Sequence, residues 1–272
     1  LNMKDKLPEG WEIAKSENVL EAIIDYRGKT PKKSDTGIPT LSAKSVKNNF
    51  IDYENVYYIS KEEYNKFMVR GLPKIGDVVI TTEAPLGMVT DLKTDTIALA
   101  QRLLTIRGKK DILNNKYLKY YFQSAIGQHE LNSRATGTTV IGISQKNFRN
   151  CKVVLPPLSE QGAIASTLSV LHDKIELNNR INVNLEAQAQ ALFKHWFVDF
   201  EFPDENGKPY KSSGGVMVKS ELGMIPERWA VHRLDEVANI TMGQSPKGTS
   251  YNENGEGMVF YQGRTDFSAR FP

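Results

Sequence analysis

A long series of mainly apolar residues at heptad spacing places the strongest constraint on the fold of this chain. Steps of four and three residues alternate without a break, which is typical of a helix that packs against a partner helix. A helix from about 160 to 198, at ~1.5 Å per residue, would be roughly 60 Å long, too long to be buried within one small domain. The seam positions are Ile164, Leu168, Leu171, Ile175, Asn178, Asn182, Leu185, Ala189, Leu192 and Trp196.

The sequence also marks where this helix begins and ends. Pro157 ends the preceding segment, Ser159 can cap the helix, and Glu160 places an anion in the first turn, where the helix dipole favours it. Pro203 prevents the helix from continuing. These signals predict one helical segment bounded by prolines.

Two consecutive seam positions, Asn178 and Asn182, are polar. A polar core layer usually lowers stability while it fixes the register and the partner of a helix pair. The two asparagines bracket the midpoint of the seam, so an antiparallel pair of identical helices would bring this pair of asparagines against its own copy across the two-fold axis. A long surface helix whose asparagines face water is the alternative.

The two ends of the chain carry copies of one sequence pattern. Three short matches occur in the same order, which indicates a duplicated unit that is present once in full and once as an opening fragment. Trp11 corresponds to Trp229 in this alignment. The matched segments are LPEGWEI at 7–13 with IPERWAV at 225–231, GKTP at 28–31 with GQSP at 243–246, and GIPTLSAK at 37–44 with GMVFYQGR at 257–264.

The first copy has the pattern of an α+β domain. Its strand signals are rich in β-branched residues and bounded by Gly, Pro or Asp, and its helix signals have apolar residues at helical spacing. We expect strands at 76–81, 96–107 and 151–156, and helices at 61–68 and 115–128. The expected domains are a globular unit at 1–156, the heptad helix at 157–202, a linker at 203–224 and the second copy at 225–272.

Charge is unevenly distributed along the chain. Residues 1–156 hold 24 Lys and Arg against 17 Asp and Glu, a local net charge of +7, whereas the whole chain carries only +3. The globular unit is therefore the part suited to a polyanion, although a solvated surface alone could have this excess. Its loops mix basic residues with Ser, Thr and Gly, the donors expected at phosphates and base edges. The candidate DNA contacts are Lys29, Lys32, Lys44, Lys47, Arg134, Thr138, Thr139 and Lys146.

Motifs for catalysis are missing from the sequence. GKT at 28–30 lacks the upstream glycine of a phosphate-binding loop, because position 23 is Ile. No dinucleotide fingerprint, nucleophile elbow, or histidine pair at metal-ligand spacing is present. The single cysteine, Cys151, fits a buried strand position and a reducing compartment. We therefore expect a cytoplasmic protein with no catalytic residues, metal or cofactor of its own.

These segments together resemble a known family. VVLPPLSEQ at 153–161, the heptad helix, and LFKHWFVDFEFP at 192–203 resemble the first spacer region of type I restriction-modification specificity subunits. The two Pro-Glu-x-Trp segments and the GKTP and GQSP pair resemble the starts of the two target recognition domains of that family. The resemblance extends over effectively the whole chain.

The resemblance implies a reader of split double-stranded DNA sites. Each recognition domain would read one half-site, and two antiparallel spacer helices would set the half-site separation. Partner methylase subunits would supply S-adenosylmethionine and adenine methylation, and motor-nuclease subunits would supply ATP-dependent cleavage. This chain departs from a full-length member within the second recognition domain, so we expect a homodimer through the spacer helix if the second half is absent.

Two other classes of protein remain possible from the sequence. A coiled-coil adaptor that does not bind nucleic acid would use the same helix, but it would not explain a basic domain that begins to repeat after that helix. A catalytic methylase or nuclease would explain DNA association, but the motif search gives no support for either.

Overall fold

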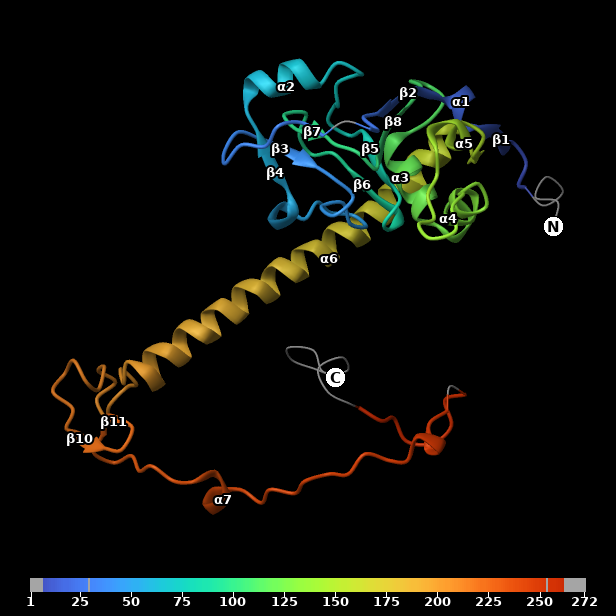
Figure 1. The fold of residues 1–272 in the computed structure, drawn as a ribbon. Coiled ribbons are helices and arrows are strands. Elements are labelled where there is room, and N and C mark those ends of the chain that lie inside the picture. The colour runs from blue at the N-terminus through green and yellow to red at the C-terminus, as the bar shows by residue number, and fades with distance from the viewer. Residues whose placement is uncertain (1–6, 29, 253, 262–272) are drawn as a thin grey trace. The chain divides into compact units, whose positions relative to one another are not determined.

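The computed structural model describes residues 7–28, 30–252 and 254–261 (Figure 1). The chain forms two compact units, Leu1–Asn184 and Leu185–Pro272, each of which is described separately. The division falls within one long helix, so that helix belongs partly to each unit. The protein is of the α+β class, as the sequence predicts.

A four-stranded antiparallel sheet lies at the centre of the first unit, in the order β2-β8-β5-β6. Its strands are β2 (Leu20–Asp25), β8 (Leu103–Gly108), β5 (Val78–Thr82) and β6 (Leu86–Asp91). A three-stranded sheet has the order β4-β3-β7, and a separate antiparallel pair joins β1 to β9. Their bounds are β4 (Tyr57–Ile59), β3 (Ile38–Leu41), β7 (Ala98–Leu99), β1 (Glu12–Lys15) and β9 (Lys152–Leu155).

The central sheet separates two hydrophobic cores. Side chains alternate between the faces of a strand, and in β5 Val78 and Ile80 join one core while Val79 joins the other. The first core also contains side chains of α3 and α4, and the second contains side chains of β3, β4 and α2, on opposite sides of the sheet in Figure 1. The helices of this unit are α1 (Ser16–Val19), α2 (Lys61–Phe67), α3 (Asn115–Gln123), α4 (Ala125–Asn132) and α5 (Gln145–Arg149), with a 3-10 turn at Tyr53–Asn55.

Most predicted elements of this unit are confirmed, and two of them are divided. The strand expected at 96–107 forms β7 and β8 with a turn between them, because exposed Gln101 and Arg102 interrupt a buried apolar run. The helix expected at 115–128 forms α3 and α4. Ser124 ends the first helix, and its hydroxyl accepts a hydrogen bond from the backbone of Gly127, which caps the second.

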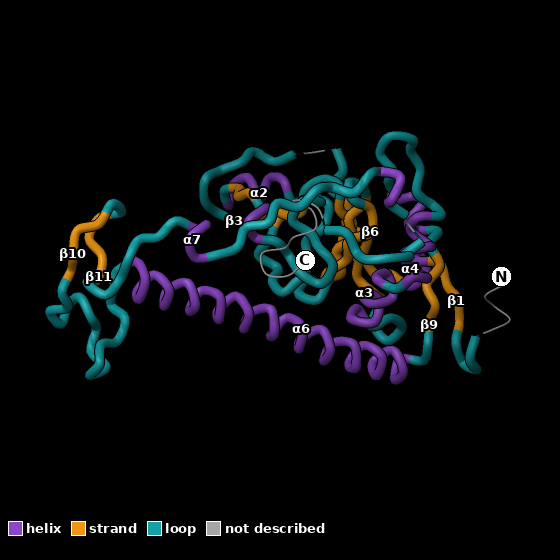
Figure 2. The backbone as a smooth tube through the Cα atoms, turned by 90° about the horizontal axis from the view of Figure 1, so that it is seen from below, coloured by secondary structure: helices purple, strands orange, loops and turns teal. Residues whose placement is uncertain are grey.

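The predicted long helix is present as α6 (Leu158–Phe193), followed by a π-helical turn at Lys194–Val198 (Figure 2). Glu160 lies in the first turn, as expected. Ser159 is not the cap, because the helix already begins at Leu158, directly after the two prolines.

The heptad seam of α6 is covered only at its N-terminal end. Ala165 is buried, and Ile164 packs against the first core. The next seam residues are open to solvent: Leu168 is 37% exposed, Leu171 58% and Ile175 60%. Leu185 and Leu192 are exposed as well. The described residues therefore leave an apolar stripe along most of the helix without a protein partner.

The second unit is organised around Trp229. Its ring stacks on Phe202 at 5.5 Å and lies 6.0 Å from Phe197 in the π-helical turn. The segment expected to be a linker, 203–224, is not structureless. It contains the Pro203 to Pro209 bridge and most of a hairpin, because its Gly and Pro residues form tight turns. The remaining elements are β10 (Met217–Ser220), β11 (Gly223–Pro226), α7 (Leu234–Val237) and a 3-10 turn at Gly248–Ser250.

The sequence repeat reappears as a repeated local structure. The backbone N–H of Trp11 donates to the carbonyl of Pro8, and that of Trp229 donates to the carbonyl of Pro226. Each tryptophan is followed, at the same offset, by a four-residue helix, α1 in one case and α7 in the other.

Candidate nucleic-acid interface

A hollow of about 540 Å³ lies at one end of the central sheet, where β2 and β5 end and β6 and β8 begin. Its lining residues lie mainly in the loops that connect the strands, so the strands fix the positions of these side chains. We call it the recognition hollow. It is lined by Thr30 and Lys33 after β2, Ser42, Ala43 and Lys44 after β3, Glu54, Asn55, Val56 and Tyr57 around the 3-10 turn, Ala84 between β5 and β6, and Ala100, Gln101 and Arg102 between β7 and β8.

Three basic side chains and one carboxylate, that of Glu54, line the hollow and give it an excess of positive charge. Lys33 Nζ lies 4.9 Å from the centre of the Tyr57 ring, and Lys44 is exposed. Within the described ranges neither lysine forms an ion pair with a carboxylate. Arg102 differs, because its Nε lies 2.8 Å from Oε1 of Glu83. The two lysines therefore keep their full charge available for an anion.

The loop at 134–144 joins the same face. Glu83 and Thr136 each form a β-bridge with Gly142, and the backbone N–H of Ile143 donates to Thr82. Arg27 donates from Nη2 to the carbonyl of Ile143 at 2.9 Å. The loop base is thus fastened beside the turn that carries Glu83.

The sequence-predicted contact residues fall at several places on the domain. Lys44 lines the recognition hollow, whereas Lys32 lines a neighbouring hollow with Lys66. Lys47 is half-buried. Lys29 lies outside the described residues. Thr138 and Thr139 are exposed on the 134–144 loop, whereas Lys146, expected in the same loop, is exposed in helix α5.

Arg134 is occupied by contacts within the protein. Its Nη1 lies 2.9 Å from Oε2 of Glu130, and its Nε donates to the carbonyl of Asn150 at 3.0 Å. The Glu130 side chain is only 6% exposed, so this ion pair compensates a buried carboxylate. Arg134 also lies in a separate shallow hollow with Asn147 and Asn150. The structure thus assigns it a folding role that sequence reasoning did not predict.

Lys33, Gln101 and Arg102 are candidate contacts that the sequence pattern does not indicate. The pattern predicts Gln101 and Arg102 in the interior of one long strand. A signal was available, because a polar pair inside the apolar run ALAQRLL does not fit a strand buried on both faces. Lys33 lies in a loop that the sequence indicated, but the residue itself was not chosen.

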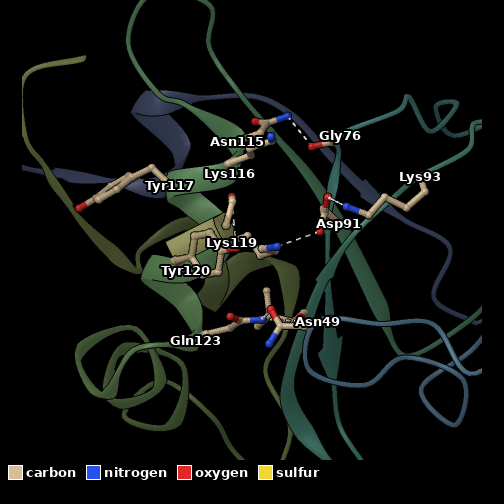
Figure 3. Close-up of polar contacts among 12 residues, drawn as sticks. Asn49, Gly76, Asp91, Lys93, Asn115, Lys116, Tyr117, Lys119, Tyr120 and Gln123 are labelled. Atoms are coloured by element: carbon tan, nitrogen blue, oxygen red, sulfur yellow. Dashed lines mark hydrogen bonds and ion pairs between the residues drawn. The ribbon is translucent and has the colours of Figure 1, made fainter. Parts of the chain in front are cut away.

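A second polar cluster lies between α3 and β6 (Figure 3). Asp91 accepts hydrogen bonds from Lys119 at 3.0 Å and from Lys93 at 2.8 Å. Burial opposes ionisation of this carboxyl group, but the two lysines outweigh burial and lower its pKa. Tyr120, whose ring lies under the Lys119 ammonium, donates a hydrogen bond to Ser169 of α6 at 3.3 Å. The cluster fastens α3 to the sheet and to the long helix.

Gln161 and Glu160 fasten the start of α6. Gln161 is 1% exposed, accepts a hydrogen bond from the backbone of Asn114, and donates to the carbonyls of Ile112 and Pro156. The indole N–H of Trp11 donates to Oε2 of Glu160 at 2.9 Å. These contacts give the last two residues of the LPPLSEQ segment a structural role, because they attach the start of α6 to the globular domain.

No group of three or more His, Cys, Asp or Glu side chains that could hold a metal occurs among the residues described. Cys151 is buried, and burial raises the pKa of its thiol to about 12, so it is a poor nucleophile at neutral pH. Within the same ranges, none of the helices is long and apolar enough to cross a membrane.

Comparisons with known proteins agree on one family. Residues 8–187 match the type I restriction modification DNA specificity domain. A protein of Methanocaldococcus jannaschii provisionally named type I restriction enzyme MjaX specificity subunit is 30% identical, over 98% of this chain and 62% of its own length. The type I restriction enzyme MjaIX specificity subunit of the same organism is 29% identical, over 92% of this chain and 56% of its own length.

A solved structure has the same fold. The type I restriction-modification system S subunit from M. genitalium matches with a TM-score of 0.51 and 16% identity, over 71% of this chain and 48% of its own length. The chain spans little more than half the length of the curated relatives it matches. The family match covers residues 8–187, and the similarity to the MjaX subunit covers nearly all of this chain. The chain therefore belongs to the type I restriction-modification specificity subunits.

Proposed function

We propose that this chain recognises a defined sequence of double-stranded DNA and that the recognition hollow with its surrounding loops is the contact face. The observation that carries the proposal is the pair of lysines, Lys33 and Lys44, which stand at a concave surface without carboxylate partners among the described residues. Lys and Arg side chains that neutralise phosphates supply most of the non-specific affinity for DNA, and loops with amide and hydroxyl groups read base edges.

The chain itself is a recognition subunit, and other subunits perform the chemistry. Methylase subunits would bring S-adenosylmethionine and modify adenine, and motor-nuclease subunits, bound through the methylase, would cleave DNA with ATP. These partners follow from membership of the family. They also agree with the absence of catalytic motifs from the sequence.

The long helix is the spacer of this reader, and we propose that the 272-residue chain associates through it with a second copy. The exposed seam from Leu168 to Leu192 supports this proposal, because apolar surface of this extent favours burial. A two-fold antiparallel pair would place two recognition domains at opposite ends of the helices. Such a dimer would read a split site in which the two halves are equivalent.

DNA binding by the purified chain, measured against salt concentration, tests the contact face. The double variant Lys33→Ala with Lys44→Ala should lower the slope of log affinity against log salt by about two units, one for each phosphate contact. Lys110→Ala is the matched control. Lys110 is exposed and lies just beyond β8 at the end opposite to Arg102, so it should leave the slope unchanged.

The outcomes separate the proposal from its alternatives. Failure of the wild-type chain to bind duplex DNA, alone or with methylase subunits, would favour the coiled-coil adaptor. Binding that the double variant leaves intact would place the contact face elsewhere on the domain.

A further inference from the structure

We propose that Gln101 and Arg102 are specificity-determining residues that read the edge of a base pair, whereas Lys33 and Lys44 contact phosphates. This inference rests on the proposed function, because it assigns base-edge contacts and phosphate contacts to different side chains of the recognition hollow. Neither Gln101 nor Arg102 was expected to contact DNA from the sequence, where both lay in a predicted strand.

The backbone presents this pair from a fixed turn. On one side the N–H of Ala100 donates to the carbonyl of Leu41 at 2.8 Å, and on the other the carbonyl of Arg102 accepts from Thr82 at 2.9 Å. Arg102 has a φ of 69°, in the left-handed region that non-glycine residues rarely adopt. Ala100 and Leu103, on either side, are both 2% exposed. The two polar side chains are therefore held outward by a turn whose neighbours are locked in the core.

The chemistry of the pair suits base edges. The Gln101 side chain is exposed and, among the residues that the structure describes, forms no hydrogen bond, so both the oxygen and the nitrogen of its amide are available. An amide can pair in two places with adenine, and a guanidinium can do so with guanine, in the major groove. The Arg102 side chain remains 50% exposed although it pairs with Glu83. The contact joins Nε to the carboxylate, and within the described ranges the two terminal nitrogens form no hydrogen bond, so their N–H donors are left for a ligand.

The partner of Arg102 argues against a phosphate contact. Glu83 lies 2.8 Å from its Nε and offsets its positive charge, which weakens attraction to a phosphate. The same contact restricts the orientations that the half-exposed guanidinium can adopt, which favours geometric readout. Lys33 and Lys44 have no such partner within the described ranges, so the charge needed for the DNA backbone lies with them. Arg102, whose charge is partly offset by Glu83, thus lines the same hollow as Lys33 and Lys44, whose charges are not offset in this way.

The test compares DNA from cells that co-express the chain with its methylase subunits. The proteins are wild type, Gln101→Ala, Arg102→Ala, Arg102→Lys and the control Lys110→Ala, and the readout is the sequence around each modified adenine. Wild type and Lys110→Ala should give one identical target. Each variant at 101 or 102 should relax that target at one base-pair position and keep the others, and Arg102→Lys should not restore the preference, because it lacks the two-point fork.

A second measurement covers variants that lose methylation altogether. Thermal unfolding establishes whether the variant is folded, and its affinity is measured for the wild-type target and for duplexes with single base-pair substitutions. Arg102→Ala should reduce discrimination at one position by roughly 5- to 150-fold and leave the salt slope unchanged.

Two results would overturn the inference while leaving the proposed function standing. One is an unaltered target in all variants at 101 and 102. The other is a salt slope reduced by about one unit with discrimination intact, which would make Arg102 a phosphate contact. Absence of any defined target for the wild-type protein would instead contradict the proposed function itself.

Discussion

Cys151 and Tyr117 are buried ionisable side chains whose neutral forms the fold favours. Burial raises the pKa of the Cys151 thiol from 9.0 to about 12, and it raises that of Tyr117 from 10.0 to about 12. The Tyr117 hydroxyl also donates to the carbonyl of Val154 at 2.8 Å, which requires the protonated form. Neither group titrates near neutral pH, so their influence on stability lies on the alkaline side.

We therefore predict that the protein loses stability as the pH rises above about 9. In the unfolded chain the thiol releases its proton near its ordinary pKa, whereas in the folded chain it does so only near 12. The unfolded state then binds fewer protons, and the thiol alone should lower the free energy of unfolding by on the order of 3 kcal/mol between pH 8 and 11, with a smaller further loss from Tyr117. Urea unfolding at a series of pH values measures this effect.

Cys151→Ala provides the control, because it should remove the cysteine part of the pH dependence and leave the tyrosine part. A free energy of unfolding that stays constant from pH 8 to 11 would contradict the burial of both groups. In the native protein at pH 8, the thiol should also react with a thiol reagent far more slowly than in the unfolded chain.

At the scale of elements, the start of α6 depends on one buried amide. Gln161→Glu would keep an acceptor for Asn114 but remove the two donations to the carbonyls of Ile112 and Pro156, and it would bury a carboxyl group. We expect a loss of roughly 2–4 kcal/mol in the free energy of unfolding. Gln188→Glu, at an exposed position of the same helix, should change stability by less than about 0.5 kcal/mol. Equal effects of the two changes would show that Gln161 does not anchor the helix.

The exposed seam of α6 carries the prediction about association. Leu171 and Leu185 are each more than half exposed, and burial of a leucine contributes roughly 1.5–3 kcal/mol. Leu171→Asp combined with Leu185→Asp should therefore convert the proposed homodimer to monomers, as measured by light scattering. Val170→Asp with Val183→Asp is the matched control, because both valines are exposed but lie off the seam. This control should leave the dimer intact.

The asparagines of the seam test its register. In an antiparallel two-fold pair about the midpoint of the seam, Asn178 lies opposite Asn182 of the other copy, whereas a shifted pair would leave amides opposite leucine or isoleucine, at a cost of about 1–3 kcal/mol each. Asn178→Leu with Asn182→Leu should keep association but loosen its register or stoichiometry. A monomer mass that does not change with protein concentration in the wild type would refute the pairing.

At the scale of the whole molecule, the proposed function predicts a protein without activity of its own. The purified chain should neither transfer methyl groups from labelled S-adenosylmethionine to DNA nor cut DNA in the presence of ATP and Mg²⁺. The same preparation should support methylation once methylase subunits are added, which is the positive control. Transfer of label by the chain alone, at a rate that increases with its purity, would overturn the division of labour between subunits.

The long helix, the repeat and most strands and helices could be predicted from the sequence because each depends on a local pattern. Heptad spacing determines which side of α6 is apolar, prolines set where it begins, and both Pro-Glu-x-Trp segments form the same turn. The predictions of one strand at 96–107 and one helix at 115–128 were wrong because each segment is mostly apolar, and its short polar interruption was not recognised as a break. Ser124 and the pair Gln101 and Arg102 were such interruptions.

Only the tertiary structure decided which polar side chains are free to bind a ligand. Arg134 and Lys44 are equivalent in a sequence, but the fold pairs the first with buried Glu130 and leaves the second exposed at the recognition hollow. Gln101 and Arg102 reach the same hollow because β7 ends and β8 begins beside loops that are distant in the sequence. The physical reason is that partnership and exposure depend on which distant segments the sheet brings together, and a local pattern carries no information on that arrangement.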